Sequence, residues 1–488
     1  MVLNTTPSFE LFPEPSLLAP SKWPPRLPGI NSKTTATLLE ILKENHEKWD
    51  IFFDDDGRHN HITHQLPAIW AFGAHQDLLR GSYNKNLSLQ RPKPETIQPI
   101  TSSNFNDHLG DKTYYTAYLA FFDGIVREYN GDATSLMEKY IFSADANLSS
   151  TASESGQQPQ MLCRFLASIL HPLIHFGYGV EFGLPGLMSE GLAQTAVHDV
   201  YMAPLMPESL FNLILNGTNP HSPPVHAFTV VARILADPRF KIPGTRFFET
   251  YYPLLEKHAR ALVEYANQWT VDIQKLASDP KEIHRNIEEL QWTNTIFMHL
   301  VTSALFLPIL AASLSPTSQA LLLRTYFITC LAWWIINGRA NPDIQSFMKA
   351  EDSTNNNRSH PVPSAPYLPI HKNALSVSYP SSSSPIPAAA IAATPNPWLY
   401  ITQQASVHPD DHFPKLLRAL MHFALMYGGR KASDSEVDFA QTELAGAQML
   451  DGTLFVRAAA LTARRLENIG PDEYIAYWDR KGFFEGEE

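Results

Sequence analysis

The sequence has few cysteines and few basic residues, and both shortages exclude classes of function. Its 488 residues include two cysteines, Cys163 and Cys330, which lie far apart in apolar stretches. This spacing predicts buried free thiols in a reducing compartment and not a disulfide framework, so we expect a cytoplasmic protein. The 37 basic residues are outnumbered by 49 acidic ones, and no basic run interleaved with aromatic residues occurs. We therefore expect no nucleic-acid partner.

Several signatures of cofactor binding and catalysis are also missing. There is no G-x-x-x-x-G-K-[ST] motif, no G-x-S-x-G motif and no recognisable flavin site. GYGVEFG at 177–183 follows a predicted helix and has the wrong spacing for a dinucleotide fingerprint. The N-terminus lacks the basic and apolar segments of a signal peptide. The apolar runs at 299–314 and 320–337 contain Pro308 and Arg324, so we expect buried helices and no membrane span.

Helical periodicity dominates what is present. Hydrophobic residues make up 44% of the chain, and they recur at helical spacings with almost no alternating, strand-like segment. The sequence predicts an all-α fold, a single large multi-helix domain with long Pro/Ser-rich insertions. Its expected parts are an extended arm at 1–33, a helical core at 34–350, a low-complexity loop at 351–395 and, at 396–488, a C-terminal helical part of the same core. A further helix is expected near 435–447.

An apolar stretch from Cys163 to Asp199 carries three histidines and two glutamates, His171, His175, Glu181, Glu190 and His198. Burying such groups without partners costs a few kcal/mol each, so they indicate chemistry or specific hydrogen bonds. His171 and His175 are four residues apart and share one helical face, with the helix expected to begin at Pro172. The alternative is a pair of core histidines with ordinary hydrogen-bond partners, and the sequence leaves both interpretations open.

Two other segments add candidate ligands. His61 and His64 are three residues apart, and Pro67 predicts that their helix begins near His64. His412 lies three residues before Lys415, which stands on an apolar face. Lys415 could be a deprotonated or carbamylated lysine, or it could be a surface lysine with a buried stem. Histidines contributed by several helices are typical of metal sites in helical bundles, and imidazole suits iron, copper, nickel or zinc.

Three of these segments carry a family resemblance. HNHITHQLPAIWAFGA, HPLIHFGYGVEF followed by SEGLAQTAV, and NPWLYITQQASVHPDDHFPKLLRAL resemble, in order, the signatures of the questin oxidase-like proteins. The resemblance spans roughly residues 40–480, and it departs from the family at Pro67 and in the Pro/Ser-rich insertion. It implies an enzyme of fungal polyketide (pigment or mycotoxin) biosynthesis. The implied reaction is a Baeyer–Villiger-type oxidation, or a related oxidative cleavage, of an anthraquinone by a monooxygenase or dioxygenase with NADPH as reductant.

Two mechanisms fit this resemblance, and both take a reduced anthraquinone and dioxygen. In one, a mononuclear iron is bound by His64, His171, His175, His412 and Lys415. In the other, no metal is present, and histidines, His61 among them, deprotonate and orient the substrate. The expected substrate walls, each of which could instead be ordinary core packing, are Trp70, Phe176, Tyr178 and Trp398. Glu181 and Glu190 are expected to hold the imidazoles in place, or to pair with arginines such as Arg164.

Two other classes compete with this interpretation. His198 and Asp199 form an HD pair, as in metal-dependent phosphohydrolases, although few basic residues lie near the histidines to bind a phosphate. A non-catalytic helical scaffold with structural histidines is the third class. It predicts that replacing the histidines alters the stability of the protein without affecting any turnover.

Overall fold

The computed structural model describes residues 9–15, 23–55, 57–148, 158–211, 224–244, 247–297, 300–349, 396–432 and 439–466. The described residues up to Ala340 form one compact unit, and those from Asn341 onwards form a second. The predicted arm at 1–33, core at 34–350 and C-terminal part at 396–488 stay predictions. The predicted loop at 351–395 lies outside the described residues.

The all-α prediction is confirmed. The described residues contain no strand, and they include two isolated β-bridges, Trp49 with Pro92 and Phe52 with His59. The helices of the first unit are α1 (Ser32–Lys48), α2 (Ile62–Ala71), α3 (Gln76–Leu87), α4 (Tyr115–Glu128), α5 (Ala133–Met137), α6 (Met161–Phe165), α7 (Ala167–Phe182), α8 (Pro185–Val197), α10 (Ala227–Ala236), α11 (Phe247–Pro253), α12 (Ala259–Ala266), α13 (Ile273–Ser278), α14 (Pro280–Phe297), α15 (Val301–Ala304), α16 (Leu307–Ala311) and α17 (Pro316–Ile336).

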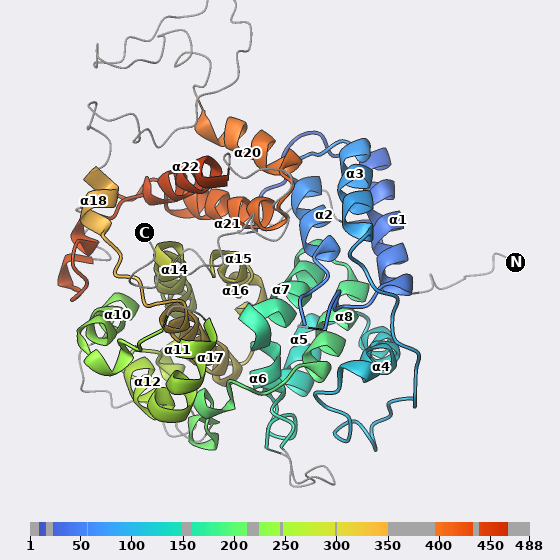
Figure 1. Cartoon of the computed structure of the whole chain (residues 1–488), viewed down its shortest axis with the longest axis horizontal. Coiled ribbons are helices and arrows are strands. Elements are labelled where there is room, and N and C mark those ends of the chain that lie inside the picture. Colours follow the sequence, from blue (N-terminus) through green and yellow to red (C-terminus); the bar gives the residue numbers. More distant parts are fainter. Residues whose placement is uncertain are drawn as a thin grey trace, which may run out of the picture. The chain divides into compact units, whose positions relative to one another are not determined.

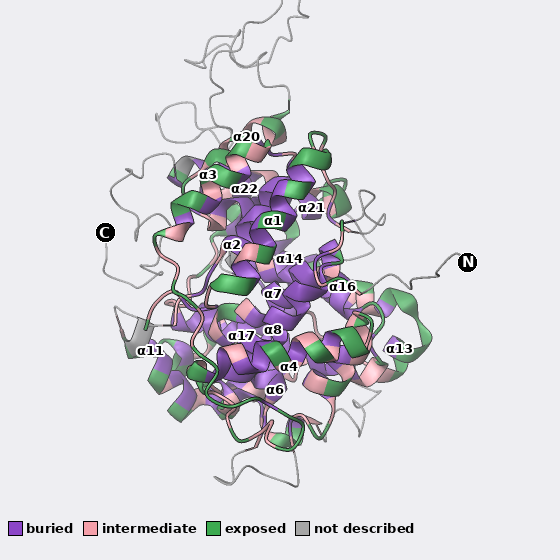
Figure 2. Cartoon of the chain, turned by 90° about the vertical axis from the view of Figure 1, so that its right-hand side faces the viewer, coloured by how far each residue is buried: buried purple, intermediate pink, exposed green. Residues whose placement is uncertain are grey.

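Helices α7 and α8 form an antiparallel pair inside the first unit (Figure 1). Gly183 ends α7 in the left-handed conformation, with a φ of 65°, and Pro185 opens α8 at its first position. The two backbones approach closely at Gly191, where an added Cβ would lie 2.8 Å from the backbone nitrogen of Phe176. Every residue of α8 is buried, and Figure 2 shows both helices mostly in the buried colour. Polar side chains on this pair must therefore find partners inside the protein.

Three helices pack around this pair and bring their own polar side chains to it. Helix α4 packs on α8, α2 packs on α7, and α1 packs on α2. A reciprocal capping box between Asn31 and Thr34 starts α1. The buried face of α1 then runs through Leu38 and Leu42 to His46, at successive spacings of four residues.

Helix α17 is the most apolar long helix among the described residues. By length and composition it alone of the described helices could cross a membrane, and its apolar window is entirely buried within the protein. A buried core helix passes the same test, so this is weak evidence for a span. The run at 299–314 contains α15 and α16, most of whose residues are also buried.

The second unit contains α18 (Ile344–Lys349), α20 (Pro397–Val407), α21 (His412–Tyr427) and α22 (Leu454–Leu466). Helix α21 packs against both α20 and α22. Its apolar face, with Leu416, Leu417 and Leu420, is buried, as its helical spacing predicts.

One predicted helix boundary and one predicted helix are wrong. Helix α2 begins at Ile62 and not near His64, and it carries Pro67 inside it. The proline removes one backbone hydrogen bond, but all ten residues of α2 are buried, and this packing outweighs the loss. The helix expected near 435–447 is absent from its described part, residues 439–447. That part holds short 3₁₀ turns, and Gly446 interrupts the backbone with a φ of 82°. The prediction that Cys163 and Cys330 are free and buried is confirmed.

Candidate active site

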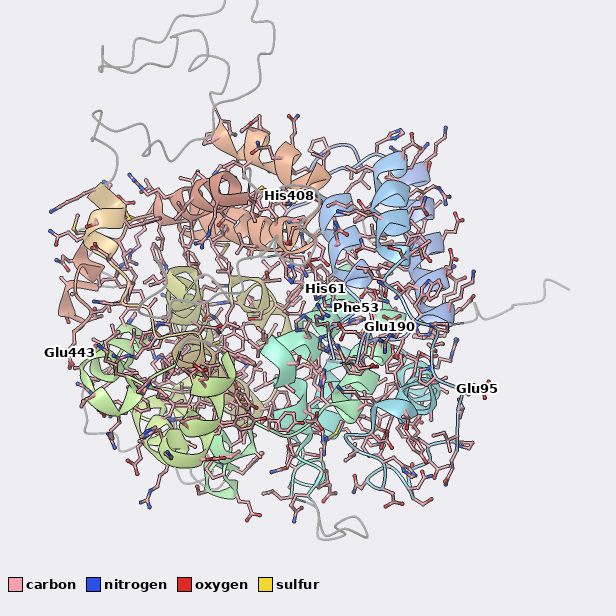
Figure 3. All side chains as sticks on the ribbon, viewed as in Figure 1. Phe53, His61, Glu95, Glu190, His408 and Glu443 are labelled. Atoms are coloured by element: carbon pink, nitrogen blue, oxygen red, sulfur yellow. The ribbon has the colours of Figure 1, made fainter. Side chains whose placement is uncertain are left out.

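Four of the predicted histidines meet where α2 packs on α7. His64 Nε2 lies 3.2 Å from His175 Nδ1, and His61 Nε2 lies 2.9 Å from His171 Nε2. The rings of His61 and His171 are stacked, with centroids 5.1 Å apart and planes 11° from parallel. The four residues thus form two cross-helix pairs. Figure 3 shows His61 among the side chains between these helices.

A backbone distortion sets the position of His171. Ser168, Ile169 and Leu170 all have left-handed backbone angles, and the regular part of α7 follows them. Three consecutive non-glycine residues in this region are strained, at about 1–3 kcal/mol each, and such strain is concentrated at functional sites. The turn brings the Ser168 carbonyl onto His171 Nδ1. A carbonyl oxygen only accepts, so Nδ1 of His171 carries a hydrogen, and its Nε2 faces His61 Nε2.

Glu190 on α8 holds the second histidine of α7 from the other side. Its Oε2 lies 2.7 Å from His175 Nε2, and its Oε1 lies 2.7 Å from His46 Nδ1 on α1. His46 Nε2 in turn lies 3.2 Å from Asp123 Oδ2 on α4. Side chains from five helices, α2, α7, α8, α1 and α4, therefore form one continuous chain of hydrogen bonds from His64 to Asp123. Figure 3 labels Glu190 near His61.

The charges along this chain follow from burial and pairing. Burial opposes protonation of His46, but hydrogen bonds to Asp123 and Glu190 outweigh it and raise its pKa to about 9. Burial opposes ionisation of Glu190, but hydrogen bonds from His175 and His46 outweigh it and lower its pKa to about 2. At neutral pH the carboxylate of Glu190 accepts from His175 Nε2. The other nitrogen of His175, Nδ1, faces His64 Nε2.

A third histidine pair flanks the first two. His59 Nε2 lies 2.8 Å from His198 Nε2, and the ring of His59 stacks on that of His171 at 4.2 Å. Burial, together with neighbouring histidine charges, lowers the pKa of His59 well below its ordinary value. Burial, with Lys112 and Arg164 nearby, lowers the pKa of His198 to about 3. Both rings are therefore neutral, and they share one hydrogen.

The HD pair of the sequence does not present its two side chains to one site. His198 points to His59, whereas Asp199 pairs with Tyr201, whose pKa it raises. A phosphohydrolase centre needs both side chains on the same metal. The geometry therefore gives the phosphohydrolase alternative no support.

The predicted aromatic walls are at three different places. Tyr178 stacks on His64, with centroids 5.5 Å apart and planes 13° from parallel, so it borders the histidine pairs. Trp70 packs edge-on against Phe182 at 5.7 Å, beneath the guanidinium of Arg26. Phe176 packs against Phe165 and against the backbone of α8. Tyr178 alone of these three makes a ring contact with a site histidine.

The remaining predicted residues lie in the second unit or elsewhere on α7. His412 starts α21, and its Nδ1 lies 2.9 Å from both Asp410 and Asp411. Burial and Lys415 oppose protonation of His412, but the two carboxylates outweigh them and raise its pKa. Lys415 is buried, so it is not a lysine with its charge at the surface. Trp398 is half-buried on α20, and Glu181 is buried on α7. Their predicted roles stay predictions.

Three members of the site, His46, His59 and Asp123, were not predicted. His46 continues the apolar face of α1 four residues after Leu42, and a histidine there is the same signal that identified His175. His59 completes the alternation His59, His61 in the segment HNH. Asp123 lies four residues after Leu119 on α4 and could have been found by the same periodicity.

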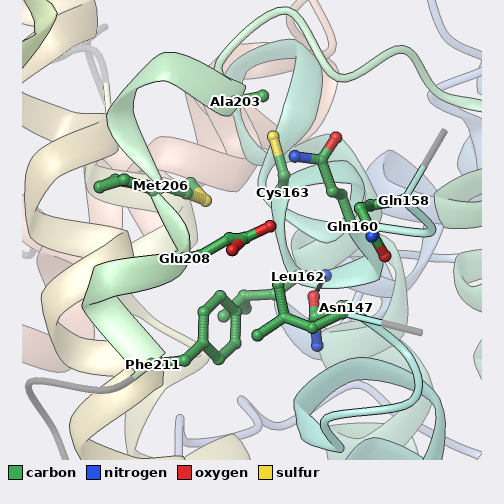
Figure 4. Close-up of a pocket in the computed structure, with 11 residues that line it drawn as sticks. Asn147, Gln158, Gln160, Leu162, Cys163, Ala203, Met206, Glu208 and Phe211 are labelled. Carbon is green, nitrogen blue, oxygen red and sulfur yellow. Dashed lines mark hydrogen bonds between the residues drawn. The ribbon is translucent and has the colours of Figure 1, made fainter. Parts of the chain in front are cut away.

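A separate cavity of about 170 Å³ lies elsewhere in the first unit (Figure 4). The side chains of Cys163, Gln160 and Glu208 face one another around it in Figure 4. No predicted catalytic or substrate-binding residue lines it. Burial raises the pKa of the Cys163 thiol to about 12, so Cys163 is a poor nucleophile.

Comparison with known proteins supplies the family. A family model described as questin oxidase-like matches residues 58–298 and 293–420. Baeyer–Villiger monooxygenase AacuH of Aspergillus aculeatus is 28% identical over 179 residues, 35% of this chain and 35% of that protein. Baeyer–Villiger oxidase GME11358 of Pestalotiopsis microspora is 26% identical over 345 residues, which cover 65% of this chain and 74% of that protein. Oxidoreductase AflY of Aspergillus parasiticus is 28% identical over 311 residues, which cover 57% of this chain and 58% of that protein.

The chain spans about a third of the length of the first curated relatives it matches, AacuH among them. The family model, in contrast, covers most of the chain and includes all the histidine pairs described above. The chain belongs to the questin oxidase-like family.

Proposed function

We propose that the chain is an oxidoreductase that inserts oxygen into, or oxidatively opens, the ring of a reduced anthraquinone-type polyketide. Membership of the questin oxidase-like family and relatives named Baeyer–Villiger oxidases support this class of reaction. The structural observation that carries it is the buried pair of His64 and His175, with His175 held by the carboxylate of Glu190.

The proposed first step is deprotonation of a phenol of the substrate by His64. In this step His175 Nδ1 accepts from His64 Nε2–H, and Nδ1 of His64 is the basic nitrogen. A proton gained at Nδ1 places positive charge on the histidine pair, and the Glu190 carboxylate stabilises this charge inside the protein. The resulting phenolate is electron-rich and can transfer an electron to dioxygen. Tyr178, stacked on His64, helps to fix the orientation of this base.

The proposed overall reaction balances with one reductant. NADPH supplies the two electrons that convert the quinone to its hydroquinone. The hydroquinone then reacts with dioxygen: one oxygen atom enters a carbon–carbon bond of the ring, and the other leaves as hydroxide and becomes water. The histidine pairs position the substrate and move its protons, and they need not carry electrons.

The first unit also contains a pair of nitrogens that could hold a metal ion. His64 and His175 present facing nitrogens, and Glu190 would orient His175 as carboxylates orient metal-bound imidazoles. An iron ion there would supply oxygen activation. His171 Nε2 faces His61 Nε2, and the other nitrogen of His171 is on a carbonyl. The facing nitrogens fit both the acid–base version and the metal version of the reaction, and the iron content of active protein distinguishes them.

The test is turnover of a dihydroxyanthraquinone, reduced with dithionite under nitrogen, after isotopically labelled dioxygen is admitted. We expect one labelled oxygen atom in the product, detected by mass spectrometry. His64→Gln should lower the rate about 10²–10⁴-fold, as expected for loss of a general base. His75→Gln, an exposed histidine of the same unit, is the matched control.

Two outcomes would overturn the proposal. Wild-type protein that incorporates no labelled oxygen would contradict the oxygen insertion. Equal rates in wild type and the folded His64→Gln variant would show that His64 is not the base, and rates equal to those without protein would favour the scaffold alternative.

A further inference from the structure

We propose that Gln194 on α8 is a further catalytic residue, whose side-chain amide donates a hydrogen bond to the oxygen atom that leaves the substrate as hydroxide. Gln194 acts in the same reaction as the histidine pairs, so this proposal rests on the proposed function. It assigns the reaction a donor that carries no charge and does not titrate.

The amide of Gln194 is buried without a partner. Its side chain is 0% exposed, and neither Nε2 nor Oε1 has a hydrogen-bond partner among the described residues. Exchanging the two atoms changes nothing, because both are unpartnered. A buried amide without partners is rare and destabilises the folded protein, so it indicates a position that a ligand completes. Glu190, one turn earlier on α8, is in contrast hydrogen-bonded at both oxygens.

Gln194 lies on the face of α8 that packs against α7. At about 100° per residue, its direction around α8 falls between those of Glu190 and Gly191. Glu190 is hydrogen-bonded to His175. Gly191 approaches the backbone of Phe176, so both neighbouring directions face α7. Because the two helices are antiparallel, Gln194 lies opposite the first turn of the regular part of α7.

This first turn of α7 belongs to the histidine site and reaches the protein surface. His171 lies there, paired with His61. His171 is half-buried, and Ile169 in the left-handed turn before it is 40% exposed. A substrate can therefore approach Gln194 from this end of α7, beside the histidines. Residues four apart on a helix have Cβ atoms about 5–6 Å apart, which places Gln194 close to Glu190 as well.

The step that Gln194 assists balances without a new reagent. The hydroquinone and dioxygen give a hydroperoxide on a ring carbon, whose outer oxygen carries the proton that His64 took from the first phenol. A neighbouring ring carbon moves with its bonding electron pair to the inner oxygen, and the O–O bond breaks. The outer oxygen leaves with that bond's electron pair as hydroxide, and it takes the proton of the second hydroxyl to become water.

The amide of Gln194 acts where negative charge develops in this step. Its Nε2–H donates to the outer oxygen as the O–O bond breaks, and it keeps its own hydrogen. Without this hydrogen bond the hydroperoxide has a competing fate. It loses hydrogen peroxide, with the proton of the second hydroxyl, and returns the quinone. The balance between inserted oxygen and released hydrogen peroxide therefore reports the role of Gln194.

The test is a single turnover, with protein in excess over a reduced dihydroxyanthraquinone, after labelled dioxygen is admitted. In Gln194→Met, which keeps an unbranched side chain and removes the amide, labelled product should form about 10²–10³-fold more slowly. Most of the substrate should instead return to the quinone with release of hydrogen peroxide, as in a reaction without protein. The urea midpoint of this variant should equal or exceed that of wild type, because no hydrogen bond within the protein is lost.

Ser189→Ala is the matched control. It also removes a buried polar atom that has no partner among the described residues of the protein, and it lies on the same helix. Ser189 is about 200° around α8 from Gly191, so it faces away from α7. We expect Ser189→Ala to match wild type in labelled product and in hydrogen peroxide.

Each outcome decides between the two proposals. If wild type incorporates labelled oxygen and Gln194→Met matches it in rate and in hydrogen peroxide, Gln194 is not the donor and the oxygen insertion stands. If wild type incorporates none, the proposed function fails and the role of Gln194 fails with it. A lower urea midpoint with the wild-type share of hydrogen peroxide identifies a structural role and also overturns the proposal. Gln194→Leu, which also lacks the amide, takes the place of Gln194→Met if that variant does not fold.

Discussion

Replacing His46 by glutamine should abolish a pH-dependent part of the stability of the first unit. The pKa of His46 rises from 6.5 to about 9 on folding, because the carboxylates of Asp123 and Glu190 outweigh burial. A raised pKa stabilises the folded state fully below pH 6.5, and this contribution is lost as the pH rises through about 9. At 1.36 kcal/mol per unit, the shift corresponds to about 3 kcal/mol.

The size of the expected effect in a melting experiment follows from the size of the unit. The unit extends to Ala340. Unfolding entropy of about 2.1 cal/mol/K per residue makes 3 kcal/mol worth about 4 °C in Tm for a unit on the order of 340 residues. The Tm of wild type minus the Tm of His46→Gln should therefore be about 4 °C larger at pH 6.5 than at a pH above 9. The difference reports His46 together with the two carboxylates it pairs with, Glu190 and Asp123.

The assay is calorimetry of wild type, His46→Gln and His75→Gln across this pH range at one scan rate. His75 has a side chain that is 65% exposed, so its variant should melt parallel to wild type at every pH. Parallel curves for wild type and His46→Gln would refute the reasoning, because they would show that His46 gains no proton affinity on folding.

Three further predictions test other features. Gly191→Ala should destabilise the first unit by about 1–3 kcal/mol in urea unfolding, because the new methyl group meets the backbone of α7, whereas Gly124→Ala on α4 meets open space and should stabilise it by about 0.5–1 kcal/mol. Elemental analysis of active protein should distinguish the two versions: one iron per chain that His175→Ala and His412→Ala both remove supports the metal version, and no stoichiometric iron supports the acid–base version. Native protein should not react with iodoacetamide at neutral pH, by mass spectrometry, because burial raises the pKa of Cys163 to about 12.

The outcomes that contradict these three are distinct. Equal urea midpoints for the two glycine variants would contradict the close approach of α7 and α8. Iron that persists through both histidine substitutions would place a metal elsewhere in the chain. Rapid alkylation of the folded protein would show that Cys163 is accessible to water.

The sequence alone determined the fold class and one half of the site. Helical periodicity specified an all-α chain, because apolar residues at three- and four-residue spacings can bury only one face of a helix. The same periodicity placed His171 and His175 on one face, and a stretch too apolar for the surface required them to have partners. It also gave Glu190 as a side chain that could hold an imidazole in place.

Only the tertiary structure decided which partner each histidine takes. His64 and His175 are 111 residues apart, and His46 and Glu190 are 144 apart. No local pattern specifies how α1, α2 and α4 pack on the α7–α8 pair, since each helix has only an apolar face and no code for its neighbour. The left-handed turn before His171 is also invisible in its sequence, because Ser168, Ile169 and Leu170 all disfavour it. The electrostatics of the site follow from that packing, since burial and pairing together set each pKa.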